Sequence, residues 1–157
     1  MGTIVLRPLR HGERRPVLEV FAGLSEASRR LRFLGAKPEL SRRELELLVD
    51  VGRRGREAVA AVEAESGRTV GIARFVRDDG APEAEVAFAV VDDAQGRGIG
   101  RRLVTELRTL AREQGILRLR ATVDRSNRPA LALVRSLGDV VAERPDGPAV
   151  ELVVRLP

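Results

Sequence analysis

A glycine-rich junction joins an apolar segment of the chain to a long amphipathic one. Three glycines alternate with other residues in Gln95-Gly96-Arg97-Gly98-Ile99-Gly100. Residues 83–91, before the junction, have the pattern of a strand, and the segment from Gly100 to Gly115 has apolar residues at helical spacing. Glycines at a helix entrance let backbone N–H groups converge on an anion, which the helix dipole also attracts. The junction therefore predicts either an anion site or only a tight strand-to-helix turn.

The spacing of these glycines excludes two common phosphate-binding motifs. The pattern G-x-G-x-G does not fit the G-x-G-x-x-G of a dinucleotide-binding Rossmann unit, and no acidic residue follows a second strand at the usual distance. A Walker A loop requires G-K-[ST], but Lys37 is the only lysine and lies far from the junction. Kinase and P-loop NTPase functions are therefore excluded.

The spacing of apolar residues changes along the chain from helical to alternating and back. The third helical segment opens with a capping-box sequence at Ser41-Arg42-Arg43-Glu44, and Ser66-Gly67 and Asp79-Gly80 predict the turns of antiparallel hairpins. The expected strands cover residues 3–7, 58–65, 69–77, 83–91, 118–123, 140–144 and 150–156, and the expected helices cover residues 12–22, 25–34, 41–51, 101–114 and 130–137. The order β-ααα-βββ-α-β-α-ββ predicts a mixed sheet in a single α+β domain over residues 1–157.

The composition excludes several kinds of site. Of the 157 residues, 43% are apolar and 32% are charged, which is typical of a globular domain. The chain has no cysteine, which excludes disulfides, thiolate metal sites and cysteine nucleophiles, and its single histidine, His11, excludes a histidine-rich metal site. We interpret His11 as a surface loop residue. No segment has the length of a signal-peptide core or a membrane span, so we expect a cytoplasmic protein that needs no metal.

The net charge of +5 comes almost entirely from arginine. Nucleic-acid binding favours basic residues interleaved with aromatic ones, but the chain has four phenylalanines and neither tyrosine nor tryptophan. A positive net charge is equally suited to attracting a phosphorylated small molecule. Binding to nucleic acid is therefore the weakest of the functional hypotheses, and we expect no nucleic-acid partner.

Two motifs in the second half of the chain are those of a known family. Gln95-Gly96-Arg97-Gly98-Ile99-Gly100 fits Q/R-x-x-G-x-G/A, and Asn127-Arg128-Pro129-Ala130-Leu131-Ala132-Leu133 fits N-x-x-A-x-x-L ahead of Gly138. With the strand and helix that flank the first motif, the chain resembles the GNAT acetyltransferase superfamily over nearly its whole length. Residues 24–33 are additionally similar to the catalytic domain of bacterial protein lysine acetyltransferases.

The resemblance implies acetyl-CoA as the cosubstrate, in a cleft where the strands of residues 83–91 and 118–123 run parallel and then separate. It implies that the pantetheine arm pairs with backbone groups like an added strand and that the pyrophosphate lies on the N–H groups of the junction. The implied cofactor-binding residues are Val90, Val91, Gln95, Gly96, Arg97, Gly98, Ile99, Gly100, Arg101 and Asn127. An ordinary helix cap explains Asn127 equally well.

In the family, an acceptor amine attacks the thioester, so a base must take its proton directly or through water. Glu85 falls where the related protein lysine acetyltransferases carry a basic glutamate, and Glu83, on the same face of the strand, is the second choice. Both glutamates also fit a half-exposed strand with no catalytic role. Many members place a tyrosine where this chain has Val134, whose side chain we expect to face the cofactor sulfur. Without tyrosine, the thiolate leaves unassisted or with help from water, Ser126 or Ser136.

These expectations describe an acetyl-CoA-dependent N-acetyltransferase whose acceptor is a primary amine, on a protein lysine or a small molecule. The missing tyrosine leaves one alternative open, a GNAT-fold module that binds CoA with little or no turnover. No motif specifies the acceptor, whose site we expect the helices before residue 52 and the last two strands to line. The sequence is compatible with a monomer or a homodimer.

Overall fold

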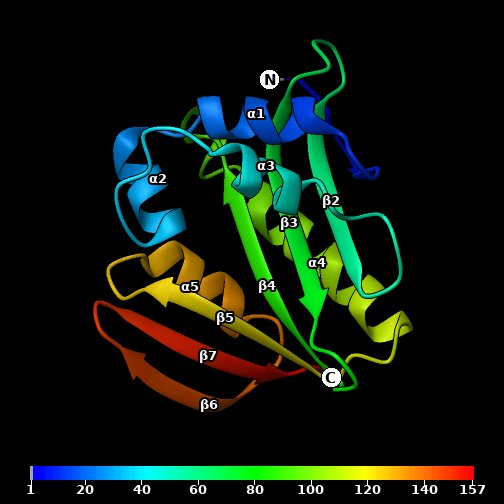
Figure 1. The fold of residues 1–157 in the computed structure, drawn as a ribbon, viewed down its shortest axis with the longest axis vertical. Helices are drawn as coiled ribbons and strands as arrows, with labels where there is room; N and C mark the ends of the chain where they lie inside the picture. Colours follow the sequence, from blue (N-terminus) through cyan, green and yellow to red (C-terminus); the bar gives the residue numbers. More distant parts are fainter. Residues whose placement is uncertain (1) are drawn as a thin grey trace.

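Residues 2–157, which the computed structural model describes, follow the predicted order of elements (Figure 1). The strands are β1 (Ile4–Pro8), β2 (Arg56–Glu63), β3 (Thr69–Arg77), β4 (Glu83–Val90), β5 (Arg118–Asp124), β6 (Asp139–Asp146) and β7 (Ala149–Arg155). The helices are α1 (Arg14–Ala22), α2 (Glu26–Phe33), α3 (Arg42–Leu48), α4 (Ile99–Glu113) and α5 (Arg128–Arg135), with a short 3-10 helix, η1 (Asp92–Ala94), before α4. The sequence therefore predicts every element correctly except η1.

The strands described in residues 2–157 form one sheet in the order β1-β2-β3-β4-β5-β7-β6. Neighbouring strands are antiparallel, except that β4 and β5 run parallel. Their pairing starts at Glu83 with Arg118 and ends at Glu85 with Arg120. Beyond that point the two strands diverge, and Figure 1 shows a V whose vertex lies near the C-terminus. The predicted fold, including the splayed parallel pair, is confirmed.

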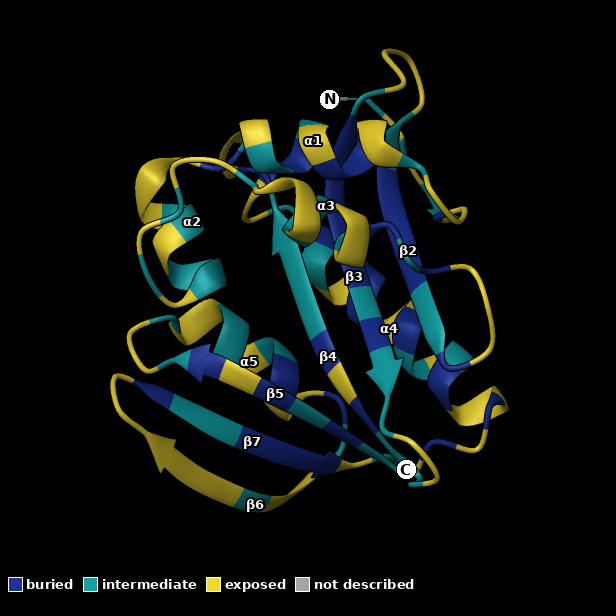
Figure 2. Ribbon diagram, viewed as in Figure 1, coloured by how far each residue is buried: buried dark blue, intermediate teal, exposed yellow. Residues whose placement is uncertain are grey.

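Different helices cover the two faces of this sheet. Gly71 of β3 faces α4, because a Cβ atom there would lie 2.9 Å from Leu103 Cδ1, whereas the next residue, Ile72, lines a cavity with α1. Consecutive strand residues point to opposite faces, so α1 and α4 lie on opposite sides, with α3 beside α1 and α5 beside α4. Figure 2 shows β2 and β3 largely buried between these layers and the edge strand β6 exposed. No helix described in residues 2–157 is long and apolar enough to cross a membrane.

The boundaries of some elements differ by a few residues from the predicted ones, where a helix cap or a proline is present. Helix α5 begins at Arg128, two residues before its predicted start, because Asn127 Oδ1 accepts a hydrogen bond from the Ala130 N–H and Pro129 fits the first turn. Strand β6 continues through Pro145 because it lies at the sheet edge, where one side of the strand needs no hydrogen-bond donors. Neither shift changes which elements meet.

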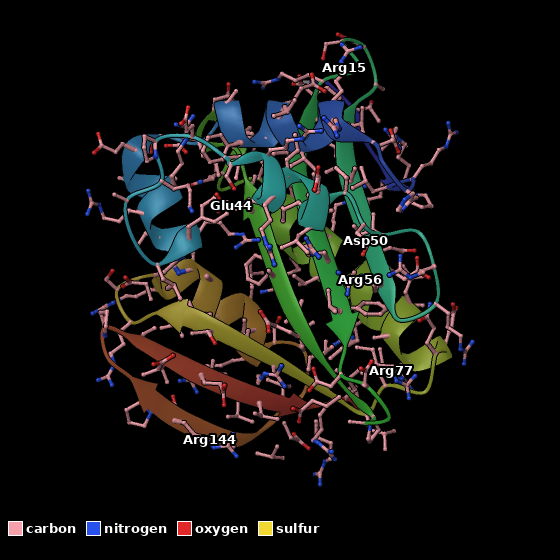
Figure 3. The ribbon with its side chains drawn as sticks, in the orientation of Figure 1. Arg15, Glu44, Asp50, Arg56, Arg77 and Arg144 are labelled. Atoms are coloured by element: carbon pink, nitrogen blue, oxygen red, sulfur yellow. The ribbon has the colours of Figure 1, made fainter. Side chains whose placement is uncertain are left out.

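The capping box predicted for α3 is present. Ser41 Oγ accepts a hydrogen bond from the Glu44 N–H (3.1 Å), Glu44 Oε1 accepts one from the Ser41 N–H (3.0 Å), and Lys37 Nζ lies 2.5 Å from Glu44 Oε2. The hydrogen bond from Lys37, reinforced by Ser41, lowers the pKa of Glu44 from 4.5 to about 2. Figure 3 labels Glu44 on α3, in front of the sheet. Because this pKa is lower in the folded state, ionised Glu44 stabilises the fold above about pH 4.5, and the stabilisation disappears as the pH falls toward 2.

We expect Glu44→Gln to lower the free energy of unfolding by about 0.5–1 kcal/mol at neutral pH, since the ion pair is partly exposed to solvent. The difference from the wild type should shrink in acid, because protonated glutamate and glutamine carry the same charge. Urea unfolding of both proteins at neutral pH and at about pH 3 measures this difference in the free energy of unfolding. The matched control is Glu46→Gln, which removes an exposed pair with Arg42 on the same helix and should change little. An equal loss at both pH values would contradict the role assigned to Glu44.

Candidate active site

The V between β4 and β5 opens a cavity in the sheet directly after its last paired residues. Its lining consists of Val86, Ala87 and Phe88 of β4, Ala121, Thr122 and Val123 of β5, Leu31 and Arg32 of α2, and Asn127 and Ala130 beside α5. Ala87 points toward the face covered by α1, whereas Val86 and Phe88 point toward the face covered by α4. The cavity is therefore lined from both faces, so a ligand placed in the V can contact groups on either side of the sheet.

Strand β4 has backbone groups that β5 leaves unpaired along the V. The Val91 N–H donates to Val70 O at 2.9 Å, toward β3. Backbone groups of alternate residues in an antiparallel pair point to opposite sides, so those of Phe88 and Val90 point toward the V. The Gln95 side chain donates from Nε2 to Val90 O at 3.0 Å and so occupies one of these groups. The Val90 N–H can thus pair with an extended ligand. Val91, in contrast, is buried and its N–H is bonded to β3, so the structure places it away from the V.

Helix α4 begins at the same end of β4 without a side-chain cap. Its N-cap residue, Gly98, has a φ angle of +77°, a left-handed conformation that glycine adopts without strain, and its first turn contains no acidic residue. By contrast, α2, α3 and α5 are capped by Ser25, Ser41 and Asn127. The first N–H groups of α4 have no acceptor within the helix, and the helix dipole makes this end positive. The helix start therefore provides unpaired donors for an anion.

A cleft of about 490 Å³ surrounds the start of α4 and shares residues with the V. The predicted cofactor residues that line it are Val90, Gln95, Gly96, Gly98, Ile99, Gly100, Arg101 and Asn127. Ile99 has a buried side chain and offers its backbone N–H, and Asn127 both caps α5 and faces the cleft. Arg97 does not line the cleft. The structure thus brings most of the predicted cofactor residues to one cavity, with Arg97 and Val91 outside it.

The two candidate bases differ in how strongly arginine binds them. Arg120 Nη1 lies 2.8 Å from Asp78 Oδ2 and 2.6 Å from Glu83 Oε2. The hydrogen bond that Arg120 donates to Asp78 is the largest cause of the raised pKa of Arg120. Glu83 also lies 3.3 Å from Arg118. Glu85 is 3.5 Å from Arg120, and its side chain is 64% exposed, compared with 21% for Glu83. Glu85 therefore has the freer carboxylate, at the vertex of the V.

Val134 does not occupy the position expected from the sequence. Its side chain is completely buried in the hydrophobic core and does not line the cleft, although its neighbour Leu133 does. The hydroxyl groups of Ser126 and Ser136 donate to Asp124 Oδ1 and Leu133 O, both at 2.6 Å, and line neither cavity. The expectation that Val134 faces the cofactor sulfur is therefore corrected, because the docked face of α5 presents other residues to the cleft.

A third cavity, of about 50 Å³, lies under α1, α2 and α3, on the face of the sheet toward which Glu85 points. Its polar residues are Arg32 of α2 and Arg74 of β3, and the rest of its lining is apolar. The helices before residue 52 line this cavity, and the last two strands do not. Sequence analysis did not single out either arginine. One available signal was that Arg74 stands between Ile72 and Val76 on a face of β3 that is otherwise apolar.

The surface histidine and the acidic residues form no evident metal site. His11 is exposed, as predicted, with Nδ1 at 3.7 Å from Asp50 Oδ1. Within residues 2–157, no group of three histidine, aspartate or glutamate side chains is placed to hold a metal ion.

The known proteins to which this chain is similar are acetyltransferases. Residues 25–139 match the acetyltransferase (GNAT) family. The chain is 32% identical over 145 residues to Acetyltransferase PA5475 of Pseudomonas aeruginosa, covering 91% of this chain and 78% of that protein. It is 38% identical over 97 residues to Acetyltransferase Pat of Mycolicibacterium smegmatis, covering 61% of this chain and 29% of Pat. The GNAT domain of S. lividans PAT has a TM-score of 0.85 and 26% identity, covering 99% of this chain and 92% of that domain.

Proposed function

Because the chain belongs to the GNAT acetyltransferase family and is an acetyl-CoA-dependent N-acetyltransferase, we propose that the α4 cleft is its acetyl-CoA site and Glu85 its general base. The observation that carries this proposal is the uncapped start of α4, which opens into a cleft that continues into the V beside Glu85. Along the joined cleft and V, the start of α4 comes first, the unpaired backbone groups of β4 follow, and the carboxylate of Glu85 lies at the far end. Such an order suits a long phosphorylated thioester whose reactive end lies at the vertex.

The residues of the cleft suit each part of acetyl-CoA. The N–H groups of Ile99, Gly100 and Arg101 are available for a diphosphate, and the Arg101 guanidinium adds a positive charge. The backbone of Phe88 and Val90 offers groups to the amide-containing arm, in the manner of an added strand. Gly100 has a packing role as well, because a Cβ atom there would lie 2.9 Å from Leu133 Cδ1. These residues hold and orient the cosubstrate.

Acetyl-CoA supplies an activated carbonyl carbon, which an unprotonated amine attacks. Glu85 accepts the amine proton, directly or through one water molecule. Its carboxylate is available for this role because it is largely exposed and its one described ion pair, with Arg120, is long, at 3.5 Å. Glu83 is a poorer choice, since both of its oxygens lie close to guanidinium groups. Arg120 acts as a positioning residue that keeps Glu85 near the vertex.

No tyrosine exists in the chain to protonate the departing thiolate. Ser126 and Ser136 are bonded elsewhere and lie outside the cleft. We therefore assign protonation of the thiolate to solvent water. Correct placement of the reactants then supplies much of the rate enhancement.

The test is a thermal-shift titration with acetyl-CoA, followed by measurement of free thiol released over a panel of small amines and lysine-containing peptides. We expect acetyl-CoA to raise the melting temperature, and thiol release to require both the protein and an amine. Stabilisation without thiol release for any amine would favour the CoA-binding module instead. An unchanged melting temperature would contradict the assignment of the cleft.

A further inference from the structure

The small cavity under α1, α2 and α3, defined here as the acceptor pocket, lies on the face of the sheet toward which Glu85 points and is apolar except for two guanidinium groups. Its lining consists of Val17, Val20, Phe21, Leu24, Arg32, Phe33, Leu40, Leu48, Ile72, Arg74, Ala87 and Ala89. Its volume of about 50 Å³ accommodates only a few water-sized groups. The pocket thus suits a short apolar group and contains a concentrated positive charge.

Neither arginine of the acceptor pocket forms an ion pair within residues 2–157. Twelve arginines form ion pairs in the part of the chain that the structure describes, and Arg32 and Arg74 are not among them. Arg32 Cζ lies 4.8 Å from the centre of the Phe33 ring, and Arg74 Nη2 lies 3.5 Å from Leu47 O. These contacts position the two side chains. The Glu85 carboxylate attracts both guanidinium groups without forming an ion pair with either, so they remain available to an anionic ligand.

The positions of the two arginines relate them to the reaction site. Arg74 is opposite Ala87 in the β3–β4 ladder, and Glu85, two residues before Ala87, points to the same face. Arg32 lines the acceptor pocket, the cavity in the V and the α4 cleft, and no other residue lines all three in the part of the chain that the structure describes. A group bound by both arginines would therefore lie between the proposed base and the end of the cosubstrate path.

Electrostatics decides which amine this pocket accepts. Burial, with repulsion from Arg74, lowers the pKa of Arg32 to about 10, and burial also lowers the pKa of Arg74. Both groups nevertheless stay protonated at neutral pH, and two like charges at one apolar site favour an anion. A lone alkylammonium group, such as that of a lysine side chain, would be repelled. An amine that carries a carboxylate on a neighbouring carbon would satisfy the arginines and still present its nitrogen toward Glu85.

We propose that the acceptor is a free α-amino acid with a short apolar side chain, whose carboxylate binds Arg32 and Arg74. This inference rests on the proposed function for its reaction, but the binding of the carboxylate is independent of turnover. The apolar lining holds the side chain of the amino acid, and the arginines fix its orientation by charge-assisted hydrogen bonds. The pocket thereby selects small zwitterions over protein lysines.

The experiment compares alanine, valine, leucine and methionine with their amides, which keep the amine and side chain but lack the carboxylate. We expect the kcat/KM for the best free acid to exceed that for its amide by about 10- to 100-fold, the size expected for hydrogen bonds to a charged group. Arg74→Gln should abolish that preference by raising the KM for the acid, while the amide changes little. Arg32→Gln should also abolish the preference, and it is judged by the ratio of acid to amide kcat/KM because Arg32 lines the α4 cleft as well. The matched control is Arg43→Gln, which removes an exposed arginine from α3 and should retain the preference.

Calorimetric titration of the same acids and amides into the protein saturated with CoA separates this inference from the proposed function. Acids that bind more tightly than amides, with the difference lost in Arg74→Gln, would support the pocket even if no amine were acetylated. Turnover of amides or lysine peptides as fast as acids, in wild type and both variants alike, would overturn the inference while leaving the acetyltransferase function intact. Equal binding of acids and amides would also overturn it.

Discussion

Gly98→Asp is expected to weaken the binding of acetyl-CoA strongly while the fold survives. Gly98 is the N-cap of α4, where unpaired N–H groups face the cleft. A carboxylate at this position would bond to those N–H groups itself and repel a diphosphate. Two like charges about 4 Å apart near a protein surface repel by up to about 4 kcal/mol, so we expect binding to weaken by about 100- to 1,000-fold. Calorimetric titration with acetyl-CoA measures the change.

The matched control for this variant is Gly67→Asp. Gly67 has nearly the same backbone conformation, with a φ angle of +75° compared with +77°, and an added Cβ atom meets nothing within 4 Å at either position. The two variants therefore carry the same backbone strain and the same new charge, but Gly67 lies in the turn between β2 and β3. Gly67→Asp should bind acetyl-CoA like the wild type. If Gly98→Asp also did, the diphosphate could not lie at the start of α4.

The order of elements is predictable from the sequence because it depends on local patterns. The alternation of β3 and the helical spacing of α4 differ clearly in period, and glycine turns separate the strands. The capping box at Ser41 is likewise a local signal, and the structure contains it. The predicted start of α5, at residue 130, is two residues too late. Pro129 indicates the first turn of a helix but does not indicate which residue before it acts as the cap.

The arrangement of the site depends on long-range packing that local patterns do not contain. Val90 and Val91 are adjacent and alike, and only the pairing of Val91 with Val70 across the sheet determines which one faces the V. Similarly, the docking of α5 on the sheet directs Val134 into the core. The motif locates the loop before α4, because the glycines of this loop are close together in the sequence. The arginines of the acceptor pocket come from α2 and β3, so their proximity is visible only in the folded chain.

Glu85→Gln should lower turnover by roughly 100-fold or more at neutral pH, with little change in the affinity for acetyl-CoA. The amide keeps the size of the side chain at the vertex of the V but cannot accept the amine proton. As the pH rises, a larger fraction of the acceptor is already unprotonated, so the deficit relative to wild type should shrink. A pH profile of kcat/KM for both proteins, together with acetyl-CoA affinity by calorimetry, measures these effects.

Glu83→Gln is the matched control for Glu85→Gln, because it changes the same residue type two positions earlier on the same face of β4. Glu83 is tied to Arg118 and Arg120, at 3.3 and 2.6 Å, so its loss should lower the free energy of unfolding rather than change the pH profile. The two variants thus separate proton transfer from ion pairing at one strand. A Glu85→Gln enzyme within about twofold of wild type at every pH would exclude Glu85 as the base, and a pH-dependent deficit in Glu83→Gln alone would transfer that role to Glu83.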